Sequence, residues 1–233
     1  MRKIGLIILF AVLSANLIAV KITDKLWLKA VELKSKSLNI YPTRTQHKTV
    51  VKNKKGKIEM NENIILSHKE VNGRIINSFV SGSSGDESLS KDSKQVKEYL
   101  KQSVLFDDMS VFKAETSPDF SLKRIGPEII KDKKYVKYKV KMVTERDDEE
   151  VECSGYVWLE STSGTPLKLV LDVEPNQMTV KSIDIVTYYS VSDSGFLITD
   201  KVVTDIVVSV IVEKMFITNT IIRENYLKCN YQE

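Results

Sequence analysis

The sequence predicts a mainly β domain of the α+β class, built on one largely antiparallel sheet. From Thr49 onward most of the chain alternates apolar and polar residues with the period of two that indicates strands. Turn-forming residues separate these runs, and helical periodicity occurs in only two short stretches. The runs amount to about nine strands, more than the five or six of an average sheet. We therefore expect the sheet to curl and to have a concave face.

Residues 1–19 have the pattern of a secretory signal peptide. Arg2 and Lys3 precede the apolar run 4–13, and small residues follow as far as Ala19. The apolar run is shorter than the roughly 20 residues that a membrane-spanning helix needs. We predict cleavage after Ala19 and a single domain, 20–233, that is periplasmic or secreted. The alternative is an uncleaved membrane anchor.

The two helical stretches are Thr23–Lys36 and Ser90–Ser103. Thr23 is the candidate N-cap of the first helix, because a threonine hydroxyl can accept a backbone N–H bond at a helix start. The second helix follows a loop rich in serine and glycine, which makes it an insertion between strands.

The strands are expected to follow one another as hairpins. Asn72 and Gly73 suit a type I′ turn, because both residues tolerate a positive φ. The clearest expected strands are 49–52, 58–68, 156–160, 167–173, 180–190, 202–212 and 215–228. In the hairpin 156–173, Val157 and Leu159 share one face of the first strand.

Charge and motifs argue against several classes of function. The chain has 35 Lys and Arg against 31 Asp and Glu, and the signal peptide contains two of the bases. The charges are interleaved, unlike the concentrated basic face of a nucleic-acid-binding protein. Nucleophile elbows, phosphate loops and zinc-helix motifs do not occur. His47 and His68 fall near the polar ends of early strands, so we expect them to be inert. No enzyme activity and no cofactor are expected.

Cys153 and Cys229 are the two cysteines of the sequence. In an oxidising compartment they could form one disulfide, or they could remain two separate buried thiols. Two cysteines without a nearby histidine do not make a structural zinc site, which needs four ligands. No metal site is expected.

The inner face of the predicted sheet carries the functional question. Ile183, Ile185 and Tyr189 alternate with polar residues, whereas the stretch 206–212 is almost continuously apolar. An antiparallel strand that is apolar on both faces is covered on both faces. The cover is either ordinary core or a lipid that lies in a groove.

Two segments resemble the outer-membrane lipoprotein-sorting (LolA-like) proteins. One is the hairpin Gly155-Tyr-Val-Trp-Leu-Glu160 followed by Gly164-Thr-Pro-Leu-Lys168, and the other is Leu122–Ile130 with Tyr135–Tyr138 after it. The strand that begins at Val180 fits the same pattern. The resemblance extends loosely over residues 45–229 and is strongest over 122–190.

The resemblance implies a curved antiparallel half-barrel of about nine to eleven strands, with two or three short helices covering its concave face. It implies a periplasmic, monomeric carrier that holds acyl chains of lipids or lipoproteins and exchanges them with an inner-membrane or outer-membrane partner protein. The expected cavity wall consists of Trp158, Ile183, Ile185, Tyr189, Ile206, Val208 and Val210. The alternative is an envelope regulatory or sensor domain of the same fold that binds a protein partner.

Overall fold

The computed structural model describes residues 23–101, 111–112, 119–146, 149–175, 177–210 and 213–229. The predicted signal peptide lies outside these residues. In chain order the described elements are α1 (Lys25–Lys36), β1 (Ile40–Asn53), β2 (Ile58–Val71), β3 (Arg74–Ser84), β4 (Glu87–Ser88), α2 (Lys94–Lys101), β5 (Ser121–Ile130), β6 (Lys133–Arg146), β7 (Glu149–Glu160), β8 (Pro166–Val173), β9 (Val180–Val191), β10 (Leu197–Val210) and β11 (Glu213–Lys228). The mainly β class predicted from the sequence is confirmed.

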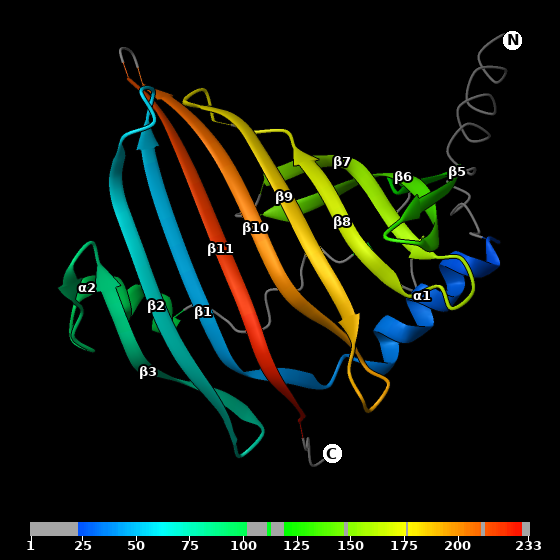
Figure 1. Ribbon diagram of the computed structural model, residues 1–233, viewed down its shortest axis with the longest axis horizontal. Helices are drawn as coiled ribbons and strands as arrows, with labels where there is room; N and C mark the ends of the chain where they lie inside the picture. Colours follow the sequence, from blue (N-terminus) through cyan, green and yellow to red (C-terminus); the bar gives the residue numbers. More distant parts are fainter. Residues whose placement is uncertain are drawn as a thin grey trace, which may run out of the picture.

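All eleven strands form one open antiparallel sheet, ordered β4-β3-β2-β1-β11-β10-β9-β8-β7-β6-β5. Strands β1 to β4 form one run of hairpins and β5 to β11 form another, and each strand in a run pairs with its neighbour in sequence. The pairing of β1 with β11 joins the two runs, with Ile40 opposite Lys228 and Asn53 opposite Met215. The centre of the sheet therefore depends on contacts between opposite ends of the chain (Figure 1).

Local chemistry explains two of the hairpins. Asn72 and Gly73 have φ values of 53° and 74°, which confirms the predicted Asn-Gly turn between β2 and β3. At the tip of the β7–β8 hairpin, Gly164 has a φ of +78°, and an added Cβ would lie 2.7 Å from the Cβ of Lys29 on α1. Only glycine fits there, since the turn needs a positive φ and the helix packs directly against it.

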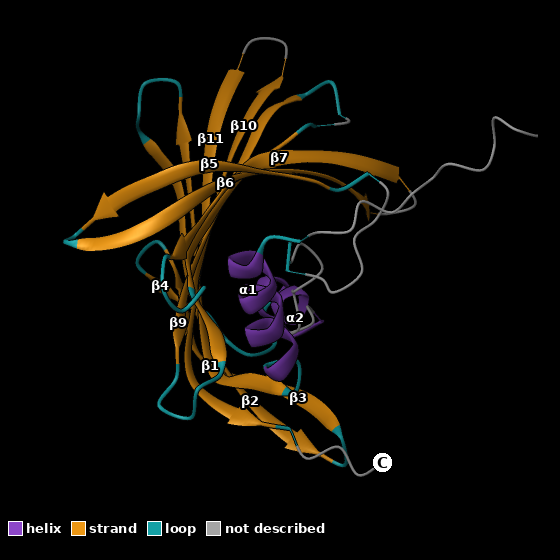
Figure 2. Cartoon of the chain, turned by 90° about the vertical axis from the view of Figure 1, so that its right-hand side faces the viewer, coloured by secondary structure: helices purple, strands orange, loops and turns teal. Residues whose placement is uncertain are grey.

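Both helices lie on the same side of the sheet, which bends around them (Figure 2). The large core cluster, called the α1 cluster below, lies between α1 and strands β6 to β9. A smaller cluster lies between α2 and strands β2 and β3. The face that carries the helices is called the concave face below, and the opposite face is called the convex face.

Candidate functional site: the concave face

The first helix is fixed to one end of the concave face by its apolar side. Leu26, Trp27 and Ala30 are buried, with Trp27 and Ala30 fully enclosed. The Trp27 ring packs 5.3 Å from the ring of Phe112 and 5.6 Å from that of Tyr138, measured between centroids. Aromatic rings in such tilted arrangements add to the stabilisation that burial provides.

The start of α1 is bonded to the sheet. The N-cap is Asp24 and not Thr23, a correction to the sequence-based expectation, because the Asp24 carboxylate accepts the N–H groups of Leu26 and Trp27 at 2.9 and 3.1 Å. The same carboxylate accepts the Tyr138 hydroxyl at 2.9 Å and the Arg124 guanidinium at 3.2 Å.

The charge state of the Asp24 carboxyl follows from these bonds. Burial by itself would raise its pKa, but the bonds from Trp27, Tyr138 and Leu26 and the charge of Arg124 lower it below the usual value. The carboxylate therefore joins the helix start to β5 and β6.

The second helix covers the opposite end of the concave face with fewer apolar contacts. Val96 is its fully buried residue and packs on Ile64 and Leu66 of β2. Polar bonds supply further attachment: the Tyr99 and Thr49 hydroxyls lie 3.0 Å apart, and the Asn77 side-chain amide donates to the carbonyl of Leu100 at 3.1 Å.

Between the two helix-covered ends lies an apolar stretch that belongs to neither core cluster. Ile206 pairs with Ile183, which packs against the α1 cluster, so Ile206 faces the concave side. The strand pairing shows which residues of β11 and β1 face the same side and extend this apolar stretch. Its apolar members are all half-buried and are called the central patch: Val51, Val202, Ile206, Val208, Met215, Ile217 and Ile221.

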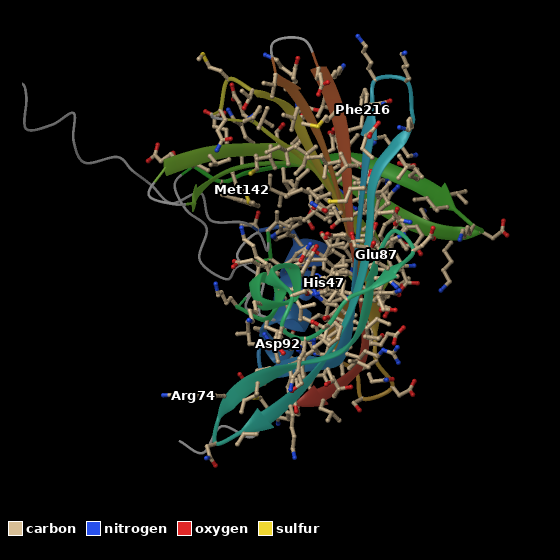
Figure 3. All side chains as sticks on the ribbon, turned by 90° about the vertical axis from the view of Figure 1, so that its left-hand side faces the viewer. His47, Arg74, Glu87, Asp92, Met142 and Phe216 are labelled. Atoms are coloured by element: carbon tan, nitrogen blue, oxygen red, sulfur yellow. The ribbon has the colours of Figure 1, made fainter. Side chains whose placement is uncertain are left out.

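A polar network lies at one end of the central patch. The Thr45 hydroxyl bonds the Nε2 atoms of both His47 and His68, at 3.1 and 2.9 Å, and His68 Nδ1 lies 3.0 Å from the Asn77 side-chain oxygen. The His47 ring also packs against Tyr99 of α2, with centroids 5.1 Å apart. Figure 3 shows His47 on the helix side of the sheet and Phe216 on the other.

The network changes the expectation for the two histidines. His68 is only 5% exposed, and both residues lie within long strands, so they are not the exposed strand-end residues predicted from the sequence. Burial and the nearby charges of His68 and Arg223 lower the pKa of His47 to about 4. Burial and Arg223 likewise lower the pKa of His68, against an opposing bond to Asn77.

The predicted wall residues divide between the two faces. Ile183, Ile185 and Tyr189 pack against the α1 cluster from β9, and Ile206 and Val208 belong to the central patch. Val210 continues this face to the exposed end of β10, where it stands opposite Glu213. The structure thus places six of the seven residues on the concave side. Their role in binding stays a prediction.

Trp158 lies on the convex face, which corrects its assignment to the wall. It pairs with Lys137 and Lys168, whereas its neighbours Val157 and Leu159 point into the core. The ammonium groups of these lysines lie 4.8 and 4.3 Å from the centre of its ring system, and its Nε1 donates to Glu128 at 2.9 Å. Strand alternation requires this side, because adjacent residues point to opposite faces.

Cys153 and Cys229 form no disulfide, so of the two alternatives the structure follows the separate buried thiols. Cys153 belongs to the core under α1, whereas Cys229 follows β11 and donates its N–H to the carbonyl of Asn39. Burial raises the pKa of the Cys153 thiol. Among the described residues, no cluster of acids, histidines and cysteines fits a metal ion, and no helix is long and apolar enough to cross a membrane.

No protein-family model and no curated protein matches the chain. Among solved structures, it is similar to an outer membrane lipoprotein-sorting protein domain from Vibrio parahaemolyticus, with 8% identity, a TM-score of 0.39, and coverage of 89% of this chain and 95% of that one. It is also similar to a DUF1329 family protein from Desulfovibrio piger (9% identity, TM-score 0.34, coverage 89% and 93%). A third is the MucA/MucB complex of Pseudomonas aeruginosa, with 11% identity, a TM-score of 0.23, and coverage of 88% of this chain and 98% of that one. The first of these structures carries the name of the family that the sequence resembles.

Proposed function

We propose that the protein is an exported carrier that binds acyl chains of lipids or lipoproteins on the concave face of its sheet. The observation that carries this proposal is the central patch, an apolar surface on the three adjacent strands β1, β11 and β10 that joins neither core cluster. An aliphatic chain is the ligand that suits such a surface, because it needs contact area and no hydrogen-bond partners.

The energetics suit a carrier, which has to release what it binds. Each buried methylene contributes about 0.8 kcal/mol, so a chain of about ten methylenes gains roughly 8 kcal/mol before the loss of freedom on binding is counted. That figure corresponds to micromolar affinity. The contacts are therefore strong enough to hold an acyl chain and weak enough to release it.

The decisive test uses two neighbouring residues on opposite faces of β10. Ile206 belongs to the central patch, whereas Val207 stands opposite Ser182 and Phe216 on the convex face. We expect Ile206→Asp to weaken binding of a fluorescent fatty-acid probe at least tenfold, and Val207→Asp to change it less than twofold. Both variants are first checked for unaltered circular dichroism.

Equal binding by the two variants, or no binding by the wild-type protein, would rule out the concave face as an acyl site. A further folded variant, Ile185→Asp, extends the test to β9. Its loss of binding should be smaller, because Ile185 also packs against the α1 cluster.

One observation favours a second candidate, a regulatory domain with a protein partner. On the convex face, Lys137 lies over the rings of Tyr156 and Trp158, and Lys201 lies 6.0 Å from the ring centroid of Tyr188. Aromatic residues are enriched at protein interfaces. Under this candidate, Tyr188→Ala would abolish capture of a specific envelope protein while leaving lipid binding unchanged. Under the carrier proposal it would change neither.

A further inference from the structure

The concave face changes in polarity along the direction of its central strands. On β11 the residues of this face run from Met215 and Ile217 through Asn219 and Ile221 to Arg223. The eight residue steps from Met215 to Arg223 correspond to roughly 27 Å at about 3.4 Å per residue. One end of this strip is apolar, its middle carries an amide, and its other end carries a guanidinium.

Basic side chains from four elements gather at the Arg223 end, where Arg223 pairs with Thr45, the residue whose hydroxyl bonds both histidines. The charge of Arg223 acts on Lys34 of α1, His47 of β1 and His68 of β2. The charge of Arg223 also acts on Tyr189 of β9, a residue of the expected cavity wall. Burial and the charge of Arg223 lower the pKa of Lys34 to about 8. The group is called the basic end below: Lys34, His47, His68 and Arg223.

The hydrogen bonds of the network fix the tautomers of the neutral histidines. The Asn77 amide nitrogen donates to the Leu100 carbonyl, so its oxygen faces His68 and accepts the Nδ1–H of that ring. His68 Nε2 is then an acceptor for the Thr45 hydroxyl proton. The Thr45 oxygen in turn accepts the Nε2–H of His47. His47 Nδ1 therefore lacks a proton and gains one when the ring becomes charged.

We propose that the basic end binds the anionic headgroup, a carboxylate or a phosphate, of an amphiphile whose chain lies on the central patch. The inference rests on the proposed function, because it needs the chain to occupy that patch. The Arg223 guanidinium can bond two oxygens of either anion at once. An anion would also offset the repulsion among the bases and favour the protonated form of His47.

Three probes of equal chain length separate the headgroup from the chain: decanol, decanoate and decyl phosphate. Competition with a bound fluorescent fatty alcohol measures the affinity of each. We expect at least one of the anions to bind at least tenfold more tightly than decanol. A preference confined to decanoate would identify a carboxylate site, and one confined to decyl phosphate would identify a phosphate site.

Arg223→Gln should remove the preference for the anion and leave decanol binding unchanged. The matched control is Arg44→Gln, since Arg44 lies on the neighbouring strand β1 but on the convex face, beside Glu224 at 3.8 Å. In the wild-type protein, an anionic probe should also raise the pKa values of His47 and His68 in NMR titrations, whereas decanol should not.

The outcomes separate this inference from the proposed function. Equal affinity for all three probes, with unchanged histidine pKa values, would overturn the anion site while the acyl-binding proposal survives. Failure of all three to bind would overturn both. If Arg223→Gln does not fold, the histidine titration in the wild-type protein decides the question by itself.

Discussion

The two helix-covered ends of the concave face differ in how they are held together. Among the described residues, seventeen buried side chains form one cluster at the α1 end, whereas three form the cluster at the α2 end. The helix α1 presents Trp27 to several aromatic rings and is capped by Asp24. The helix α2 has a single fully buried residue, Val96, and depends in part on polar bonds.

This difference assigns distinct mechanical roles to the two ends. A helix held mainly by a large apolar cluster opens only with a large part of the fold. A short helix held by a small cluster and a few hydrogen bonds opens at a lower free-energy cost. We therefore infer that α2 opens locally before α1 does.

The comparison predicts its largest effect for Trp27→Ala. Removing a fully buried indole ring leaves a cavity among the surrounding aromatic rings, so we expect the free energy of unfolding to fall by about 4 kcal/mol. Urea denaturation measures the change. The control is Leu28→Ala on the same helix, which is 47% exposed and should cost less than about 0.5 kcal/mol. Equal costs for the two variants would contradict a packed α1 end.

At the other end, Val96→Ala should cost about 2 kcal/mol, because two methyl groups leave a small cluster that can partly close. Hydrogen exchange should show faster opening of α2 and unchanged protection of α1. Val80→Ala on exposed β3 provides the control. Faster exchange throughout the sheet would mean that the two ends open together, which would remove the distinction between them.

Much of this architecture could be predicted from local sequence patterns. The Asn72-Gly73 turn, both helices and the expected strands occur in the structure, because hairpins and strand alternation depend on residues close in sequence. The face of Trp158 was also predictable. Since Val157 and Leu159 share the core face, the intervening Trp158 must lie on the other.

The basic end could not be predicted from local patterns. It brings His47 and Arg223 together only because β1 pairs with β11, and no short-range signal specifies which strands become neighbours across so many residues. For the same reason, local sequence patterns predict two inert histidines. Local sequence does not distinguish Thr23 from Asp24 as the N-cap, because both are good caps, and the bond from the distant Tyr138 favours the aspartate.

The histidine network predicts a pH dependence that belongs to the α2 end. The pKa of His47 is about 4 in the folded protein, against a usual value of 6.5. The unfolded chain therefore binds the proton first, and this part of the stability is complete above pH 6.5 and is lost as the pH falls toward 4. Allowing for partial exposure, the loss is on the order of 2 kcal/mol.

The matched variant is His47→Gln, which removes this titration. Denaturation at pH 7 and pH 4.5 should show a smaller drop in stability for the variant than for the wild-type protein. The groups that face His47 are His68 on β2, Arg223 on β11 and Tyr99 on α2. Parallel pH profiles for the two proteins would contradict the prediction, because they would mean that folding leaves the pKa of His47 unchanged.

At the α1 end the corresponding change is smaller and lies at lower pH. Asp24→Asn keeps an acceptor for the N–H groups of the first turn but removes the negative charge beside Arg124 and the helix start. We expect a cost of about 1 kcal/mol at pH 7, because the pKa of Asp24 is lowered in the fold and the carboxylate is therefore the favoured form.

The stabilisation by the Asp24 carboxylate is present above the usual pKa of 3.8 and is lost as the pH falls through the lower, folded value. Denaturation at pH 7 and pH 2 should thus show a difference between variant and wild type that disappears in acid. A difference that persists at pH 2 would show that the carboxylate charge contributes nothing and that the side-chain geometry alone fixes α1 to the sheet.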